Sequence, residues 1–323
     1  MGRYLIRRVL FGVLVLFVIS MLTFLIFMKL PAGDPARRLA GRQPTPEILD
    51  QIRENYGLND SFLTQYWRFA RGLIPLPGFF LNEEIYYSWA NRQAVKGEIA
   101  EAFQYTAVLT AGAVVLWLAI GIPIGILSAL KRRSIADRAA MTFALVGVSF
   151  PTFWLGYLLI FAFYYKLGWA PPTGVEIGDG PIETALKGKY LLAWITLAVT
   201  SAAFYTRVVR GNMLETLSED YIRTARAKGL SDRRVTYKHA FRASVTPVVT
   251  MLGLDMAGLL AGAVITEQVF VLPGLGRYAI RALEGQDFPP VMAVTLLAAL
   301  FIVVANLVVD VIYAALDPRV RYT

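Results

Sequence analysis

The chain has 323 residues, of which 56% are hydrophobic and 17% are charged. This balance excludes an ordinary soluble domain, in which about 25% of residues are charged. The absence of cysteine excludes disulfides, thiolate nucleophiles and cysteine metal sites. The formal net charge of +9 indicates membrane topology before a nucleic-acid partner, because basic residues of membrane proteins gather on the cytoplasmic side.

Six apolar runs are long enough to cross a bilayer, for which a helix needs about 20 apolar residues. They are Val9–Met28, Ala102–Leu130, Ala139–Tyr165, Tyr190–Thr206, Ala243–Thr266 and Phe288–Val309. The first follows a basic start, but its apolar run is longer than that of a signal peptide, so we interpret it as a retained span. The sequence therefore predicts an all-α membrane protein with six transmembrane helices.

The placement of Lys and Arg predicts the orientation of these spans. Residues 1–8, 131–138 and 207–242 carry net charges of +3, +3 and +5. The alternate segments 31–103, 166–189 and 267–288 carry −1, 0 and −1. We therefore expect the three basic segments and both termini to lie in the cytoplasm.

Residues 31–101 are predicted to form a small external subdomain between the first two spans. Thr45 and Pro46 are typical of a helix start and Gly57 of a helix end. Residues 61–73 follow as a second, amphipathic helix, which "IPLPGFF" at 74–80 interrupts. The subdomain either contacts a partner outside the membrane or caps the helix ends.

Small residues and prolines mark the spans. Two pairs of glycines are spaced four residues apart: Gly121 with Gly125, and Gly258 with Gly262. This spacing lets helix backbones approach closely in lipid, although many spans of no special role have it. Pro123 and Pro151 are expected to kink the second and third spans.

Asp255 is the one carboxylate deep within a predicted span. It shares a helical face with Gly258 and Gly262, so it should face protein or a water-filled cavity. A charge within the membrane is costly, which favours a functional role in the translocation path or its gate. The alternative is a structural Asp that is bonded to a neighbouring helix.

The segment from Asp220 to Arg234, "DYIRTARAKGLSDRR", carries five basic residues between apolar runs. Its signals predict two short helices joined by a glycine turn. The signals are a cap at Ser218, acids at Glu219 and Asp220, a cation at Lys228, a stop at Gly229 and a second cap at Ser231.

Three interpretations fit this basic protrusion, which is predicted to lie below the membrane. It lies on anionic lipid, it only sets topology, or it docks into another protein. Ala225, Ala227 and Gly229 favour docking, because a helix that seeks lipid carries large apolar side chains on its buried face.

The stretch "YIRTARAKGLSDRRVTYKHAFRASVTPVVT" closely resembles the EAA loop of ABC-importer permeases of the peptide/nickel class. Further similarities are "RRVL" near the start, "GDP" at 33–35, "SFPTFWLG", "TEQVFVLPGLGR" and "NLVVDVIYAALDPRVR". They extend over nearly the whole chain, and the long segment after the first span resembles the B-type subunit of dipeptide or oligopeptide permeases. Residues 74–92 fit the B-type pattern poorly. Arg223 and Thr224 depart from the general EAA pattern.

The resemblance implies a type I ABC importer (MetI-like) permease fold. We divide the chain into residues 1–30 (first span), 31–101 (external subdomain), 102–316 (five-helix core) and 317–323 (cytoplasmic tail). The core includes a cytoplasmic coupling segment at 211–242. The implied partners are a second, C-type permease, two ATPase subunits or domains, an extracytoplasmic substrate-binding protein and the lipid of a prokaryotic cytoplasmic membrane, but no nucleic acid.

The resemblance also assigns residues. Those implied to couple the pore to the ATPases are Tyr221, Ala225, Arg226, Lys228 and Gly229. Ala225 would permit close approach and Gly229 the turn between the short helices. Pro273, Gly274 and Gly276, after the fifth span, are candidates together with Asp255 for the translocation path or gate.

We expect no catalysis, metal or cofactor in this chain, with ATP and Mg²⁺ on the partner subunits. The sequence contains no phosphate-binding G-x-x-x-x-G-K-[ST] motif. The single histidine, His239, has no companion for a metal site. The expected function is that of the pore-forming subunit of an ATP-driven importer of peptides, although the sequence does not name the cargo. The alternative is a stand-alone secondary transporter or channel, but ionisable residues spread over several spans are absent.

Overall fold

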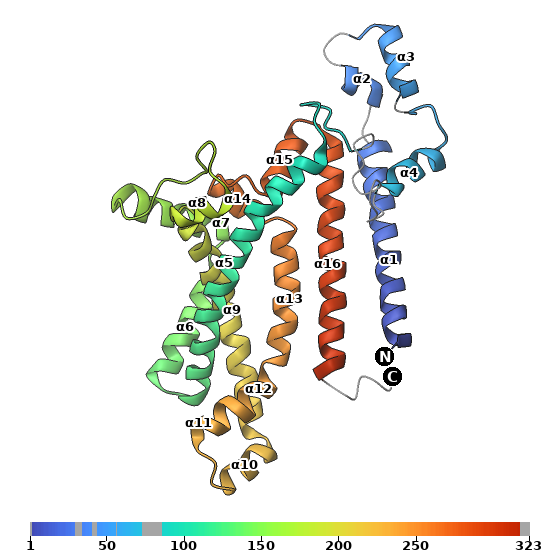
Figure 1. Cartoon of the computed structure of the whole chain (residues 1–323). Coiled ribbons are helices and arrows are strands. Elements are labelled where there is room, and N and C mark those ends of the chain that lie inside the picture. Colours follow the sequence, from blue (N-terminus) through green and yellow to red (C-terminus); the bar gives the residue numbers. More distant parts are fainter. Residues whose placement is uncertain (1, 30–33, 41–43, 56, 73–85, 317–323) are drawn as a thin grey trace.

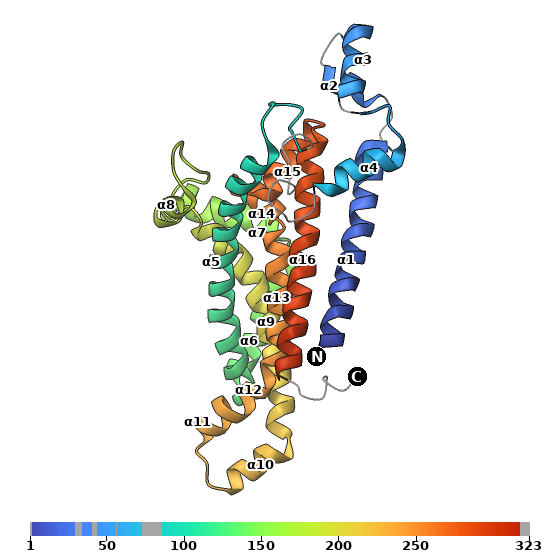
Figure 2. The same cartoon turned by 45° about the vertical axis from the view of Figure 1, so that its right-hand side comes forward.

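The computed structural model describes residues 2–29, 34–40, 44–55, 57–72 and 86–316, which are largely helical (Figure 1). Long helices lie side by side, and short helices gather at both ends of the bundle, as Figure 2 also shows. Within the described ranges, strand pairing is limited to one isolated bridge between Tyr87 and Ala94. The expected all-α fold is confirmed.

Four stretches are long and apolar enough to cross a membrane as they stand. They are Ile6–Lys29, which covers most of α1 (Gly2–Phe24) and η1 (Leu25–Lys29), then α5 (Val95–Leu130), α9 (Leu191–Ser218) and Phe288–Ile312 of α16 (Phe288–Leu316). Two bent helix pairs bring the number to six if each pair is one span. Since α5 begins at Val95, the expected boundary at residue 102 falls inside a helix. The boundary at residue 211 likewise falls inside α9.

Helices α5 and α9 form the closest long pairing, and glycine makes it possible. A Cβ atom on Gly121 would lie 3.0 Å from the carbonyl oxygen of Ala202, and one on Gly125 would lie 2.9 Å from that of Thr206. The Thr206 hydroxyl also donates to the Gly121 carbonyl at 3.3 Å. The predicted close approach at Gly121 and Gly125 is therefore confirmed. Helix α5 continues through Pro123 as a single element, so the kink expected there does not interrupt it.

The third predicted span is divided into two segments. Helix α6 (Ile135–Ser149) ends before Pro151, and α7 (Thr152–Leu159) with η2 (Ile160–Lys166) leaves at 101°. Phe150 adopts an extended conformation because the proline ring disfavours helical geometry in the preceding residue. At 1.5 Å per residue α6 is about 22 Å long, too short to cross the membrane core alone. The bend predicted at Pro151 is thus present, but at 101° it divides the expected helix over 139–165 into two segments.

The fifth span is shorter than expected. Helix α13 (Thr246–Leu260) follows Asp232–Ser244 at a bend of 50°. It ends before Gly262, whose φ of +127° favours glycine, and the chain then forms α14 (Val264–Val269). A Cβ on Gly262 would lie 2.8 Å from the Gly276 backbone nitrogen, whereas one on Gly258 would have nothing within 4 Å. The predicted close packing thus holds at Gly262 and is wrong at Gly258 within this chain.

The segment predicted to be external packs at the carboxyl end of α1. It contains α2 (Pro35–Ala40), α3 (Pro46–Asn55) and α4 (Phe62–Arg71), whose starts at Pro46 and after Ser61 agree with the sequence. Phe24, the last residue of α1, packs with Tyr66, Phe69 and Tyr86 in a buried cluster. Lys29 also donates to the Gln65 side chain at 2.8 Å. This segment is therefore joined to the membrane bundle, while "IPLPGFF" lies outside the described residues.

Helix α16 packs against both α1 and α13. A Cβ on Gly12 would lie 2.8 Å from Val303, and one on Gly253 would lie 2.6 Å from Val309. Near one end of this contact, Arg8 pairs with Asp310 at 3.0 Å. The first span is thus held to the bundle by the last one.

Gly125→Ala should destabilise the protein, because the added methyl group must displace the Thr206 carbonyl or the Val209 side chain. We expect a cost of about 1–3 kcal/mol, measured as a lower thermal unfolding midpoint in detergent. The matched control is Gly211→Ala in α9, where a Cβ meets nothing within 4 Å. Alanine there should be neutral or stabilising by up to about 1 kcal/mol. Equal midpoints for the two variants would contradict the close packing.

Candidate functional site

The basic segment forms a compact protrusion at the end of the bundle opposite to the external helices (Figures 1 and 2). It consists of α10 (Asp220–Ala227), α11 (Asp232–Arg234), η3 (Val235–Ala240) and α12 (Phe241–Ser244). We call residues 219–244 the cytoplasmic protrusion, following the orientation predicted from charge. The two short helices joined by a glycine turn are confirmed, and α12 returns the chain to α13.

The start of α10 differs from the prediction. Helix α9 continues to Ser218, whose hydroxyl donates to the Glu215 carbonyl at 2.6 Å. Glu219, with an extended backbone, is the residue before α10. The cap predicted at Ser218 was therefore wrong, because α9 extends beyond its apolar run to the turn. Ser231 does precede α11 as predicted, although its side chain makes no capping bond there.

Gly229 occupies a backbone conformation that favours glycine. Its φ is +75°, a left-handed conformation that costs other residues about 1–2 kcal/mol. The Leu230 amide donates to the Ala225 carbonyl at 3.3 Å and the Gly229 amide to the Arg226 carbonyl at 2.9 Å. This pair of bonds is the Schellman arrangement that ends a helix. A Cβ at this position would meet nothing within 4 Å, so backbone conformation alone accounts for the glycine.

The predicted coupling residues differ in their exposure to solvent. Ile222 and Ala225 are buried, in a cluster with Met213 and Val235 of the same chain. Tyr221, Arg226, Lys228 and Gly229 are exposed. Ala225 packs closely within this chain, and its contact with a partner stays a prediction. Partial burial raises the pKa of the Tyr221 phenol above its ordinary value, so Tyr221 remains a neutral O–H donor.

A buried carboxylate joins three long helices near the protrusion. Asp137, which is 4% exposed, accepts hydrogen bonds from Arg210 Nε at 2.7 Å and Nη2 at 3.0 Å. Its carboxylate also accepts from the Ser128 hydroxyl at 2.6 Å and the Arg133 amide at 2.8 Å. These bonds join α5, α6 and α9. Sequence analysis counted Asp137 only as a charge, and its partner lies 73 positions away.

Asp255 lines an open cavity between four helices. The cavity has a volume of about 480 Å³ and is bounded by α5, α6, α9 and α13. Asp255 is exposed on its wall, and the Tyr205 hydroxyl donates to its Oδ2 at 2.7 Å. Both sequence-based alternatives therefore describe part of its environment: Asp255 is bonded to a neighbouring helix and also lines a cavity. A role in transport stays a prediction.

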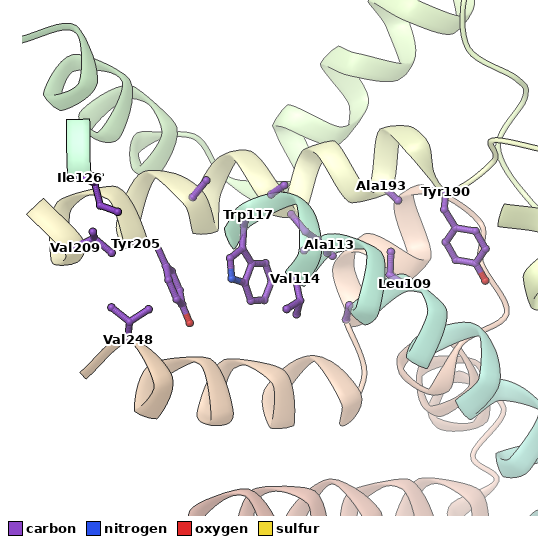
Figure 3. Packing of buried hydrophobic residues seen from close by; sticks show 14 of the residues in the cluster. Leu109, Ala113, Val114, Trp117, Ile126, Tyr190, Ala193, Tyr205, Val209 and Val248 are labelled. Atoms are coloured by element: carbon purple, nitrogen blue, oxygen red, sulfur yellow. The ribbon is translucent and has the colours of Figure 1, made fainter. Parts of the chain in front are cut away.

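The cavity wall holds large aromatic side chains. Trp117 and Tyr205 project from α5 and α9, and their ring centroids lie 5.8 Å apart. Figure 3 shows these rings side by side, with the Tyr205 oxygen directed toward the helix that carries Val248. That helix is α13, which also carries Asp255. Gly258 lines the same cavity, which explains why its Cβ position is open.

The loop after α13 is organised by a buried carboxylate that sequence analysis did not single out. Glu267 of α14 is 0% exposed. Its Oε1 accepts from the Thr106 hydroxyl at 2.7 Å, and its Oε2 accepts from the Arg277 amide at 2.9 Å. Thr106 in turn accepts from the Leu275 amide at 2.9 Å. The carboxylate therefore holds the amino end of α15 (Leu275–Glu284), where free amides favour negative charge.

The predicted gate glycines fit around this carboxylate. A Cβ on Gly274 would lie 2.3 Å from the Glu267 carboxyl group, and one on Gly276 would lie 2.6 Å from the Val264 backbone. Both glycines are buried, and Pro273 is half-buried. None of these three residues lines the Asp255 cavity as far as the described residues define it. The structure thus explains the glycines by packing, and their gating role stays a prediction.

Comparison with known proteins assigns the family. The chain matches the model of the "Binding-protein-dependent transport system inner membrane component" over residues 121–322. Residues 1–110 match the model of the N-terminal part of such membrane components. The chain belongs to this family. It is a membrane permease subunit of an ABC importer, and the resemblance to the peptide/nickel class is confirmed.

Full-length relatives agree with this assignment. The permease is 38% identical over 322 residues to the glutathione transport system permease protein GsiC of Escherichia coli (strain K12). It has the same identity to GsiC of Shigella boydii serotype 4 (strain Sb227), with 100% of both chains covered in each comparison. An inward-facing structure of the MetNI methionine ABC transporter matches with a TM-score of 0.55 and 18% identity. That match covers 69% of this permease and 97% of the other chain, and it shows the type I importer permease fold.

Glu267→Gln should loosen α15 of this permease. The glutamine side chain keeps one acceptor oxygen, and its NH2 group cannot accept, so one of the two donors that face the carboxylate loses its partner. We expect a cost of about 1–3 kcal/mol and faster hydrogen exchange in the Leu275–Glu284 helix. Glu284→Gln, at an exposed position of the same helix, is the control and should exchange as the wild type does. Unchanged exchange in Glu267→Gln would contradict the anchoring role.

Proposed function

We propose that this permease forms part of the pore of an importer that moves peptides across the cytoplasmic membrane of a prokaryote. The observation that carries the proposal is the cytoplasmic protrusion, whose exposed face presents Tyr221, Arg226 and Lys228 beside the turn at Gly229. Its opposite face packs on the permease itself through Ile222 and Ala225. A protrusion fixed on one side and open on the other is suited to transmit force from a soluble partner.

The proposed partners are two ATPase subunits or domains, a second, C-type permease and an extracytoplasmic binding protein. ATP and Mg²⁺ are held by the ATPases, because this sequence has no phosphate-binding loop. The peptide cargo is supported by the peptide-class sequence pattern and by relatives named for glutathione, itself a tripeptide. Residues 1–8, 131–138 and 207–242, with charges of +3, +3 and +5, favour cytoplasmic termini.

The proposed mechanism uses the protrusion as a lever. Closure of the ATPases on ATP draws the protrusions of the two permeases together. Arg226 and Lys228 supply charged contacts, and Tyr221 supplies an aromatic one. The movement passes to α9 directly and to α13 through η3 and α12. Rotation of these spans opens the cavity outward, and hydrolysis resets it.

Purification from the native membrane in mild detergent tests the partners. The permease should bring with it a second six-span permease and ATPase subunits that hydrolyse ATP. A single cysteine at Ser231, in a chain that has none, should cross-link to an ATPase subunit and so place the protrusion in the cytoplasm. Recovery of a homo-oligomer alone, without ATPase, would instead support a stand-alone transporter.

Arg226→Ala with Lys228→Ala should uncouple the reconstituted complex. We expect peptide uptake and the stimulation of ATP hydrolysis by loaded binding protein to fall about tenfold, within the usual range of coupling free energies. Gly229→Pro should act similarly, because proline cannot adopt a φ of +75°. Arg132→Ala, an exposed cation on the other cytoplasmic loop, is the control for general charge effects. Normal uptake in Gly229→Pro would refute the coupling role.

A further inference from the structure

The cavity at Asp255 has an unbalanced charge. Asp255 is the sole charged side chain among the described residues that line it. Tyr205 donates to Oδ2, and within the described part of the chain Asp255 has no cationic partner. A carboxylate at this depth is costly unless it is paired or faces water. Its remaining acceptor sites are therefore directed at whatever occupies the cavity.

The surrounding side chains suit a positively charged group of moderate size. Of the three aromatic residues at this wall, Phe204 is exposed, whereas Trp117 and Tyr205 are buried behind the cavity surface. The exposed ring of Phe204 can attract an ammonium ion. The Tyr205 hydroxyl already donates to the carboxylate, so it fixes the position of that carboxylate without neutralising its charge. The volume of about 480 Å³ is within the range of small-molecule sites and admits a short peptide end.

A second polar group on this wall also lacks a partner. Trp117 is 0% exposed, and its Nε1–H makes no hydrogen bond in the structure. Buried donors are normally satisfied, but this one lies behind the cavity surface, so an acceptor in the cavity would reach it only if the wall shifted. The hydroxyl side chains of Thr200 and Ser201 line the cavity as well. The Thr200 hydroxyl donates to the Thr196 carbonyl at 3.5 Å, so the wall offers one anionic acceptor beside the Ser201 hydroxyl.

We propose that this cavity is a transient binding site for a protonated primary amine, held by the exposed Asp255 carboxylate beside the ring of Phe204. The carbonyl oxygen next to such an amine in a peptide can accept from the Ser201 hydroxyl on the same wall. The identity of the amine as a peptide amino terminus rests on the proposed function. The preference for a cationic amine rests on the cavity alone.

The absence of cysteine from the chain permits a direct test on the assembled complex. Ser201→Cys places one thiol on the cavity wall. Its labelling rate is measured with 2-aminoethyl methanethiosulfonate, itself a primary amine, and with the anionic 2-sulfonatoethyl reagent, each normalised to a free thiol. We expect the amine reagent to be favoured at least about tenfold by the nearby carboxylate. Asp255→Asn should abolish this preference, whereas Tyr205→Phe, which keeps the carboxylate, should retain it.

A control and a competition complete the test. Asn59→Cys, on an exposed external turn, should show no effect of Asp255→Asn, and unchanged labelling there also reports intact folding. Trialanine added to the complex should slow labelling at Ser201→Cys, whereas N-acetyl-trialanine should not. An unchanged reagent preference in Asp255→Asn, or equal protection by both peptides, would overturn the proposal. If wild-type complex imports no peptide while the amine preference persists, the proposed cargo fails and the amine site stands.

Discussion

The pairing of α5 with α9 is the constraint on which the rest of the bundle depends. Gly121 and Gly125 bring the two backbones so close that any side chain there would meet a carbonyl oxygen. In lipid, such close contact supplies packing energy where the hydrophobic effect between helices is weak. Three acidic side chains then attach other elements to this pair. Asp137 attaches α6 to Arg210, Asp255 attaches α13 to Tyr205, and Glu267 attaches the α14–α15 loop to Thr106.

The three attachments differ in how completely the acid is satisfied, and this difference separates structure from function. Asp137 and Glu267 are both buried, and each accepts bonds on both carboxylate oxygens. Asp255 is exposed to a cavity and accepts one bond, from Tyr205, among the described residues. Because an intramembrane charge is costly, the two fully hydrogen-bonded carboxylates are readily explained as structural contacts between helices. The open one keeps free acceptor sites, which water or a ligand can reach through the cavity.

Local signals in the sequence predicted local structure well. Apolar length located the spans, residue types identified the helix start after Thr45 and the turn at Gly229, and amphipathic spacing located the helix within 61–73. The errors arose where partners are distant or where the chain bends. Nothing near Glu267 or Asp137 in sequence indicates Thr106 or Arg210, which lie 161 and 73 positions away. Pro151 predicted a kink, but a bend of 101° depends on the packing of α7 against α9 and α14, which local sequence does not encode.

The two arms that carry the protrusion also form opposite walls of the cavity. One arm is α9, in which Met213 lies under α10 and Tyr205 lies about 12 Å further along the helix axis. The other is η3 and α12, which lead into α13 and Asp255. The hydrogen bond from Tyr205 to Asp255 therefore bridges the two arms. Any displacement of the protrusion that changes the angle between these arms must also change this bond, so movement at the cytoplasmic end and the charge in the cavity are mechanically linked within one chain.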